Sequence, residues 1–400
     1  MTAMSSTKRS TQLALQPDEA WPQFGEDEIA AVAQVLRSGR VNQWTGEQVH
    51  AFEDALAARI GMPHAVALAN GSVALELALK ALGIGPDDEV IVTPASFVAS
   101  ASCVPLVGAT PIFADVEKNS QNISAETVAP HLTPATRAVI AVHLAGWPVD
   151  MAPLMALAKE NGFFVIEDCA QSIGATIGGK PAGSLGDAAV FSFCQDKIIT
   201  TGGEGGMALF RDEEVFKRAW SYKDHGKGFD AMRQPSTAPG FRFVHETIGT
   251  NWRITEMQAA IGLAQLGKLD DWLKKRAANA AIWREALAAC KALAIPEPAD
   301  DLTHANYKLI AFLRPENLKA GVTRDDVLAA LIEGGVRAFS GFCPEIYREK
   351  AFTDLNVVTR PTAQALGRTS LMFEVHPTLN TDALKARASQ ARDILARFEA

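Results

Sequence analysis

Short apolar runs alternate with helical patterns through the first half of the chain. Runs of apolar residues bounded by polar or turn residues predict buried strands at 65–69, 89–92, 111–114, 138–142 and 163–166. Apolar spacing close to 3.6 residues predicts helices between them, at 73–82, 97–106, 125–131 and 152–160. Strands that alternate with helices in this way predict a mostly parallel sheet with helices on both faces.

The regular alternation of strands and helices is absent on either side of this region. Two helical patterns, at 27–37 and 47–60, precede the first strand. The apolar runs at 188–193 and 207–210 have no full helix between them, so we expect an antiparallel strand there. Helices are predicted at 213–221 and 254–273, with 271–293 continuing as one long helix or a helix pair. Residues 226–243 are rich in Gly, Pro and Arg and predict a long surface loop.

The composition breaks near Pro296-Glu297-Pro298. The remainder predicts a smaller α+β unit, with a strand at 307–313 and helices at 324–333 and 382–398. A chain of 400 residues is also too long for one simple core. We therefore expect a loose N-terminal tail (1–20), a large domain (21–295) and a small C-terminal domain (296–400).

Charge and cysteine content exclude several classes of function. The net charge of −8 argues against a nucleic-acid or anionic-membrane partner and favours small-molecule partners. The five cysteines are scattered and never form a C-x-x-C pair, which is typical of reduced thiols, and no metal site is predicted. The first 16 residues have no apolar signal core, and no apolar run reaches membrane-spanning length. We expect a cytoplasmic protein.

The first candidate for chemistry is Lys197, which follows the strand that ends Phe191-Ser192-Phe193 and precedes a threonine pair and four glycines. An ammonium is unfavourable in a buried turn unless it has a partner. It can pair with an anion, act as a base or form a Schiff base with a carbonyl. We take the third as the working hypothesis, with pyridoxal 5′-phosphate as the carbonyl compound. The alternative is a solvated surface lysine, and the local sequence considered alone favours this alternative.

Other polar residues stand at predicted strand ends. Gly71 and Ser72 lie at a strand-to-helix turn, which is either an anion site or an ordinary Ser N-cap. Asp168 ends a strand and either pairs with a pyridine nitrogen or caps the next turn. Ser192 lies close enough along its strand to reach a phosphate. Each signal is weak alone, but their order along the chain favours a cofactor site around Lys197.

Six segments together resemble the sugar aminotransferases of the DegT/DnrJ/EryC1/StrS family, which are pyridoxal-phosphate enzymes of aspartate-aminotransferase fold type I. They are NGSVALELAL (70–79), TPASFVAS (93–100), VHLAGWPVD (142–150), VIEDCAQSIGA (165–175), FSFCQDKIITTGGEGGM (191–207) and GTNWRITEMQAAIG (249–262). The resemblance runs from about Phe24 to the last helix. It implies an α/β fold with a large domain, built on a mostly parallel seven-stranded sheet, and a smaller α+β C-terminal domain.

The resemblance also implies roles around the cofactor ring. Lys197 would form the internal Schiff base and carry protons. Asp168 would pair with the pyridine nitrogen, Gln171 would lie near the ring hydroxyl, and Phe97 would stack on the ring. This would make Lys197 the catalytic residue.

Further implied roles concern the phosphate. Gly71 and Ser72 would hold it through backbone and hydroxyl, with Ser192 helping. Asn251 would reach it from the neighbouring subunit. The resemblance therefore implies a homodimer with the active site at the subunit interface.

The implied reaction moves an amino group from an amino acid, L-glutamate, to a keto-sugar. The acceptor would be a nucleotide-linked 3- or 4-keto-deoxysugar, in cell-surface polysaccharide (lipopolysaccharide O-antigen) or secondary-metabolite biosynthesis. A pyridoxal-phosphate sugar dehydratase or other lyase, and a non-catalytic regulatory relative, are the alternatives. Lys197 disfavours the dehydratases, since those relatives have histidine in place of the lysine. The chain departs from the family with an extra glycine before Glu204 and at 340–347, which leaves the substrate open.

The roles of five more side chains stay open. His143 and Trp147 either line the pocket or pack beneath the cofactor. Glu204 either meets the substrate amine or caps its turn. Arg253 is expected to support the interface or the pocket wall, and His376 is a possible substrate contact in the small domain.

Overall fold

A seven-stranded sheet forms the centre of the computed structural model, which describes residues 19–235 and 240–400. The strand order is β1-β9-β8-β5-β4-β2-β3. Only β9 runs antiparallel to its neighbours, which confirms the mostly parallel sheet and the antiparallel strand predicted near 207–210. The strands are β1 (His64–Leu68), β2 (Glu89–Val92), β3 (Thr110–Phe113), β4 (Thr136–Val142), β5 (Phe164–Asp168), β8 (Ala188–Ser192) and β9 (Gly206–Phe210).

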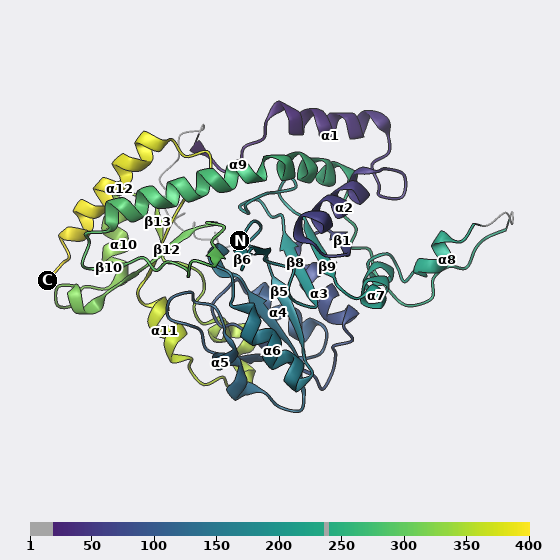
Figure 1. The fold of residues 1–400 in the computed structure, drawn as a ribbon, viewed down its shortest axis with the longest axis horizontal. Helices are drawn as coiled ribbons and strands as arrows, with labels where there is room; N and C mark the ends of the chain where they lie inside the picture. Colours follow the sequence, from purple (N-terminus) through teal and green to yellow (C-terminus); the bar gives the residue numbers. More distant parts are fainter. Residues whose placement is uncertain (1–18, 236–239) are drawn as a thin grey trace, which may run out of the picture.

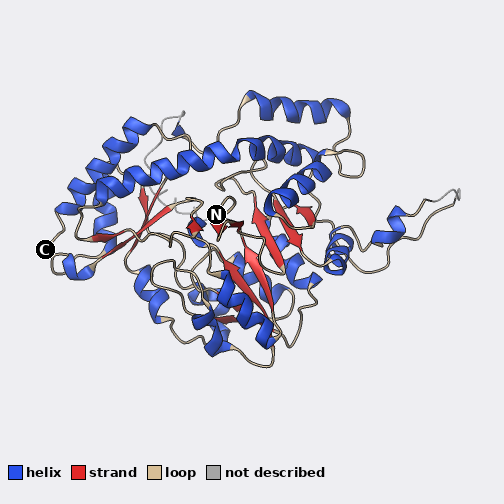
Figure 2. Cartoon of the chain, viewed as in Figure 1, coloured by secondary structure: helices blue, strands red, loops and turns tan. Residues whose placement is uncertain are grey.

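Helices cover both faces of this sheet (Figure 2). The side chain of Val190 packs into a core with α3, whereas its neighbours Ala189 and Phe191 pack into a core with α2 on the opposite face. Successive strand residues point to opposite faces, so two buried faces require continuous apolar runs, the pattern seen in the sequence. The helices around the sheet are α1 (Glu26–Ser38), α2 (Gln48–Ile60), α3 (Gly71–Ala81), α4 (Ala99–Leu106), α5 (Ala125–Val128), α6 (Met151–Asn161) and α7 (Glu213–Lys223).

One long helix, α9 (Glu256–Leu287), crosses the molecule (Figure 1). Thr255 caps its N-terminus and forms a capping box with Gln258. The prediction that helix continues to residue 293 was wrong, because Leu293 and Ala294 form strand β10 and pair with β12. Leu293 is buried in a second core, and this tertiary contact outweighs its local helical preference.

A second, antiparallel sheet has the order β10-β12-β14-β13 and packs beside α10 (Arg324–Glu333) and α12 (Thr381–Ala396). Its strands are β10 (Leu293–Ala294), β12 (Leu309–Leu313), β13 (Ala338–Phe339) and β14 (Ser370–Phe373). Trp283 and Leu287 of α9 belong to this core, although they precede residue 296. The division at 295 stays a prediction, and α9 is shared by both cores.

A third, small sheet joins the two parts of the chain. Strand β11 (Leu302–Thr303) pairs with β6 (Thr176–Ile177), which pairs in turn with β7 (Lys180–Pro181). Segment 302–307, which sequence analysis assigned to the C-terminal domain, is thereby held against residues of the large domain, and the Ala305 and Tyr307 amides also donate to the Gly146 and Ala145 carbonyls.

The predicted loose tail and the predicted surface loop both lie partly outside the described residues. Of the tail over 1–20, only Glu19 and Ala20 are described. The Glu19 side chain is buried and accepts hydrogen bonds from Arg387 and from the Asn380 amide. Of the 226–243 loop, residues 236–239 lie outside the description. The rest contains a short helix, α8 (Phe229–Arg233). We call the described residues 226–235 and 240–250 the arm, which projects beyond α7 (Figure 1). Among the described helices, none combines the length and apolar character that crossing a membrane requires.

Candidate active site

The carboxyl ends of four strands meet at one edge of the large sheet. The pairing places Val142 opposite Asp168 and Asp168 opposite Val190, and it places both Leu68 and Ser192 opposite Gly206. A cavity of about 820 Å³ opens at this edge. Seven of the predicted site residues line it: Gly71, Ser72, Phe97, Asp168, Gln171, Ser192 and Lys197. Asn251 is exposed and is not among the residues of its own chain that line this cavity.

The N-terminus of α3 forms one wall of the cavity. Its N-cap is Asn70, whose side-chain oxygen accepts a hydrogen bond of 3.0 Å from the Val73 amide. The alternative interpretation of Ser72 as the N-cap is therefore wrong. Ser72 lies in the first turn with an exposed side chain that lines the cavity. A helix N-terminus with a hydroxyl beside it is suited to an anion.

The glycines at this wall make room for other protein atoms. A Cβ at Gly71 would lie 2.8 Å from the Ser192 Cβ, and one at Gly206 would lie 2.4 Å from the Asn70 carbonyl carbon. Gly206, in the glycine-rich segment, therefore lets the start of β9 pass the N-terminus of α3, which brings α3 close to the end of β8.

Gly71→Ala should loosen this wall. The added methyl group would push α3 away from Ser192, and we expect a loss of about 1–3 kcal/mol in the free energy of unfolding. Cofactor affinity should fall as well, because the helix N-terminus would move. Gly85→Ala is the matched control, since its Cβ would meet its nearest atom at an ordinary 3.7 Å. Urea unfolding and cofactor titration measure the two effects, and equal behaviour of both variants would contradict the prediction.

Asp168 is the last residue of β5 and is 4% exposed. One carboxylate oxygen accepts a hydrogen bond of 2.8 Å from the Ser100 hydroxyl, and the other accepts one of 3.1 Å from the Ala170 amide. The Ser100 hydroxyl is also 3.1 Å from that of Ser96. These bonds fix the carboxylate in the cavity wall. Sequence analysis missed Ser100, although the spacing of four residues between the two serines was a usable signal.

Gln171 holds the turn that follows β4. Its side-chain oxygen accepts a hydrogen bond of 2.7 Å from the Ala145 amide, and Ala145 has a left-handed φ of 57°. The amide nitrogen of Gln171 is therefore the side-chain group left to donate into the cavity. Gln171 positions the backbone of its neighbours as well as lining the site.

Lys197 lines the cavity and lies in a turn. Its own amide closes this turn by donating a hydrogen bond of 3.1 Å to the Cys194 carbonyl. The Lys197 carbonyl accepts a hydrogen bond of 2.9 Å from the Trp21 indole. Its side chain is half-buried, so the premise of a fully buried lysine was wrong. Phe191 and Phe193 before it are buried, and they anchor the turn that presents the amine.

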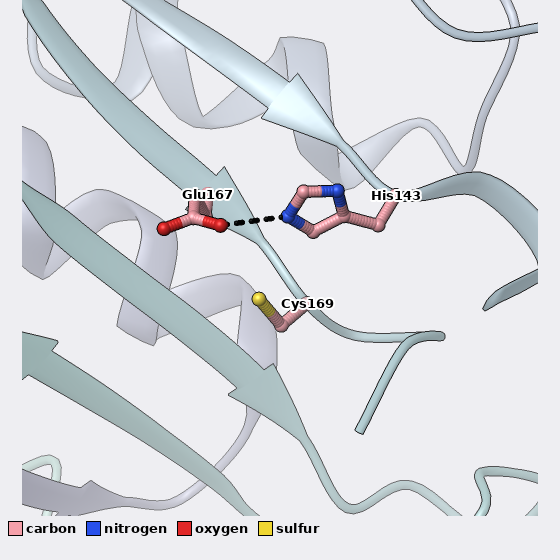
Figure 3. Close-up of side chains that lie close together, drawn as sticks. All are labelled: His143, Glu167 and Cys169. Atoms are coloured by element: carbon pink, nitrogen blue, oxygen red, sulfur yellow. Dashed lines mark hydrogen bonds and ion pairs between the residues drawn. The ribbon is translucent and has the colours of Figure 1, made fainter. Parts of the chain in front are cut away.

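Glu167, the residue before Asp168, forms a buried pair with His143 (Figure 3). Glu167 precedes Asp168 on β5, so the two carboxylates face opposite sides of the sheet. The His143 Nε2 is 3.0 Å from Glu167, and its Nδ1 accepts from the Val149 amide at 2.9 Å. This network assigns the ring proton to Nε2. Burial would raise the pKa of Glu167, but hydrogen bonds from His143 and from the Gly186 and Gly183 amides outweigh it and lower the pKa.

Cys169 completes a cluster of three potential metal ligands, whose atoms lie within 4.8 Å of one another (Figure 3). The cluster is better described as structural support. Both nitrogens of His143 are engaged, and both oxygens of Glu167 accept backbone hydrogen bonds. Burial raises the pKa of the Cys169 thiol well above its usual range, which disfavours the thiolate that binds metals.

The remaining candidates are spread over the fold. His143 and Trp147 are not among the residues that line the cavity, and Trp147 packs against His304. Glu204 lines the cavity, and its carbonyl also accepts a hydrogen bond from the Thr201 hydroxyl. Arg253 donates to Asp224 at the base of the arm, and its support of the interface or the pocket wall stays a prediction. His376 is buried in the C-terminal part, 3.9 Å from Glu374.

Glu374 should make stability depend on acid pH. Burial would raise its pKa, but the His376 ring 3.9 Å away and the Arg337 guanidinium, which donates hydrogen bonds of 2.7 and 3.0 Å, outweigh it and lower the pKa to about 2. Because the folded-state pKa is depressed from 4.5, its stabilisation is complete above pH 4.5 and is lost as the pH falls towards 2. The shift corresponds to about 3 kcal/mol. Glu374→Gln should lower stability at pH 7 and flatten this part of the acid dependence in urea unfolding. An unchanged slope would contradict it.

The groups around the cavity match the parts of pyridoxal phosphate. An amine can bind the aldehyde, a carboxylate can pair with the ring nitrogen, and a helix N-terminus with a nearby hydroxyl suits the phosphate. Lys197, Asp168 and Ser72 provide these groups in one cavity. The donor set therefore fits the predicted cofactor.

Comparison with known proteins supports the same conclusion. Residues 22–389 match the model of the DegT/DnrJ/EryC1/StrS aminotransferase family. The chain is 35% identical to the spore coat polysaccharide biosynthesis protein SpsC of Bacillus subtilis, over 94% of this chain and 96% of that protein. It is 38% identical to GDP-perosamine synthase of Caulobacter vibrioides, over 84% and 86%.

Solved structures agree with these relatives. An aminotransferase from Psychrobacter cryohalolentis superposes with a TM-score of 0.92 at 46% identity, covering 95% of this chain and 99% of that one. DesV of S. venezuelae superposes with a TM-score of 0.83 at 31% identity, covering 92% and 94%. The predicted family, fold type, enzyme class and cofactor are confirmed. The chain belongs to the DegT/DnrJ/EryC1/StrS aminotransferase family and is a pyridoxal-phosphate-dependent aminotransferase of fold type I.

Proposed function

We propose that the enzyme transfers the amino group of L-glutamate to a keto-sugar carried on a nucleotide. The observation that carries this proposal is the meeting of Lys197, Asp168 and the N-terminus of α3 around one cavity of about 820 Å³. A cavity of this size has room for a sugar beside the cofactor. The names of two relatives, GDP-perosamine synthase and SpsC, support a sugar acceptor.

The reaction assigns a separate task to each group. When bound, pyridoxal phosphate supplies an aldehyde that takes the amino group and a protonated ring that stabilises negative charge. Asp168, fixed by Ser100, would hold the ring nitrogen in its protonated form. Lys197 would anchor the aldehyde, and its Nζ would take up the proton that leaves the donor's α carbon and hold it for return. Phe97 would cover the ring and limit the entry of water.

We further infer that the product is an aminosugar for cell-surface polysaccharide, such as lipopolysaccharide O-antigen, or for a secondary metabolite. SpsC, a spore coat polysaccharide protein, supports the first destination. We place the reaction in the cytoplasm. The five free cysteines support this location, since none is paired in a disulfide and reduced thiols are typical of that compartment.

We infer that the active unit is a homodimer. Among the described residues that line the cavity, Lys197 is the only cation, whereas Asp168, Asp196, Glu204 and Glu349 are acidic. The phosphates of a sugar nucleotide and of the cofactor therefore call for polar groups from outside this set. Asn251 lies exposed at the base of the arm and would reach the cavity of a second copy.

The arm itself supports an interface with a second copy. It carries large apolar side chains that face solvent in the single chain, with Phe243 93% and Ile248 91% exposed. Its cations Lys227 and Arg233 lie over aromatic rings of their own chain, at Trp44 and at Phe229. Neither cation is among the residues that line the cavity of its own chain, and we infer that they approach a sugar nucleotide in the site of the partner subunit.

A two-step assay tests the reaction. Purified enzyme with bound cofactor is first mixed with L-glutamate, and conversion to the pyridoxamine form is followed by absorbance. A panel of keto-sugar nucleotides is then added, and loss of that form identifies the acceptor. If no amino donor produces the pyridoxamine form, the proposed transfer is wrong. Mixed subunits test the dimer: Lys197→Ala and Asn251→Ala proteins, each inactive alone, should regain activity together if Asn251 serves the partner's site.

A further inference from the structure

The amine of Lys197 lies over the ring of Tyr307, 5.2 Å from the ring centroid. Both residues line the cavity, and Tyr307 is only 3% exposed. The negative face of an aromatic ring attracts an ammonium group. We propose that Tyr307 is a positioning residue, whose ring holds the Lys197 amine at the cavity wall while that amine is not bonded to the cofactor. This inference rests on the proposed attachment of the cofactor at Lys197.

The ring of Tyr307 is held from several sides. Its hydroxyl donates a hydrogen bond to the Asp196 carboxylate, next to Lys197 in the chain. Its amide donates to the Ala145 carbonyl at 3.0 Å, and its carbonyl accepts from Arg276 Nη1 at 3.2 Å. Phe342 stacks on the ring at a centroid distance of 6.3 Å and an angle of 22°. A side chain fixed in this way can orient a flexible neighbour.

The hydroxyl of Tyr307 is not suited to take part in proton transfer. Burial and the adjacent Asp196 raise the pKa of the phenol well above its usual range, so the phenol stays neutral and remains a donor to Asp196. Other charged or titratable groups near the ring are Arg276, Lys308 and Cys194, and the Lys308 amine is 5.5 Å from the centroid. What Tyr307 offers to Lys197 is therefore the face of its ring.

This arrangement has a consequence for the reaction. When the donor's amine replaces that of Lys197, the four-carbon stem of the lysine becomes free to rotate. Confining the free lysine side chain costs conformational entropy. A neighbouring group that already restricts the side chain lowers the entropy that is lost when the amine reattaches. The ring of Tyr307 would keep the amine within reach and shorten the search before it reattaches.

The test measures how fast the cofactor attaches to Lys197. Apoenzyme is mixed with pyridoxal phosphate, attachment is followed by absorbance, and borohydride reduction with mass spectrometry gives the fraction bound at Lys197. Tyr307→Leu should slow attachment by about threefold to thirtyfold. Tyr307→Met is a second variant without a ring, in case the first does not fold. Tyr307→Phe keeps the ring and should lose distinctly less than either.

Two controls separate positioning from other effects. Tyr347→Leu removes another buried tyrosine whose hydroxyl also bonds a carboxylate, Glu345, but which is not among the residues that line this cavity, and it should leave attachment unchanged. In a Lys197→Ala background, Tyr307→Leu should not change the affinity for non-covalently bound pyridoxal phosphate. Weaker binding there, an equal loss in Tyr307→Phe, or no loss in the ringless variants would each overturn the inference. Absence of label at Lys197 in the unaltered enzyme would instead overturn the proposed function.

Discussion

Replacing Lys197 with alanine should abolish turnover while leaving the protein folded. The side chain is half-buried at a cavity wall, and its amine makes a ring contact with Tyr307, so little packing is lost on truncation. The reaction, in contrast, loses both the anchor of the cofactor and the carrier of the proton. We expect the rate of amino transfer to fall by at least about a thousandfold.

Lys180→Ala is the matched control, because Lys180 is an exposed lysine on β7. It should retain the activity of the unaltered enzyme and the borohydride-dependent label. The Lys197→Ala protein should lose the label and keep its circular dichroism spectrum. A reducible covalent link that persisted in Lys197→Ala would show that another amine holds the cofactor.

Asp168→Asn should have the second-largest effect. Asparagine has nearly the same shape and can still accept a hydrogen bond from Ser100, but it carries no charge to keep the ring nitrogen protonated. The stabilisation of negative charge during proton removal would weaken, and we expect the rate to fall on the order of a hundred- to a thousandfold. Cofactor affinity should fall less than the rate, since the phosphate site at α3 is untouched.

Ser100→Ala distinguishes the charge of Asp168 from its orientation. That variant keeps the carboxylate and the bond of 3.1 Å from the Ala170 amide, but it removes the bond of 2.8 Å from the hydroxyl. We expect a loss smaller than that in Asp168→Asn, measured as the single-turnover rate with L-glutamate. If both variants lose equally, orientation and not charge is the dominant contribution of this carboxylate.

Local patterns in the sequence predict much of the fold. The strands between residues 64 and 168 are buried on both faces, so their apolar runs are continuous and predict a parallel sheet without further information. The end of α9 and strand β10 were not predictable in the same way. Leu293 has a helical neighbourhood in the sequence, and only its pairing with Leu313, 20 residues further on, makes it a strand.

The features of the candidate site also fall into those that the sequence predicts and those that only the tertiary structure decides. The sequence by itself determined the residue types and the strand ends on which they lie: Lys197, Asp168, Ser192 and the turn at Gly71. These follow from short-range patterns and from the resemblance that their order carries. The tertiary structure decided which of them meet and what supports them, because contacts between distant segments leave no periodic trace in a single chain. Ser100 on Asp168, Trp21 on the Lys197 carbonyl and Tyr307 beneath the lysine amine come from segments 68, 176 and 110 residues away, and only folding brings them to the site.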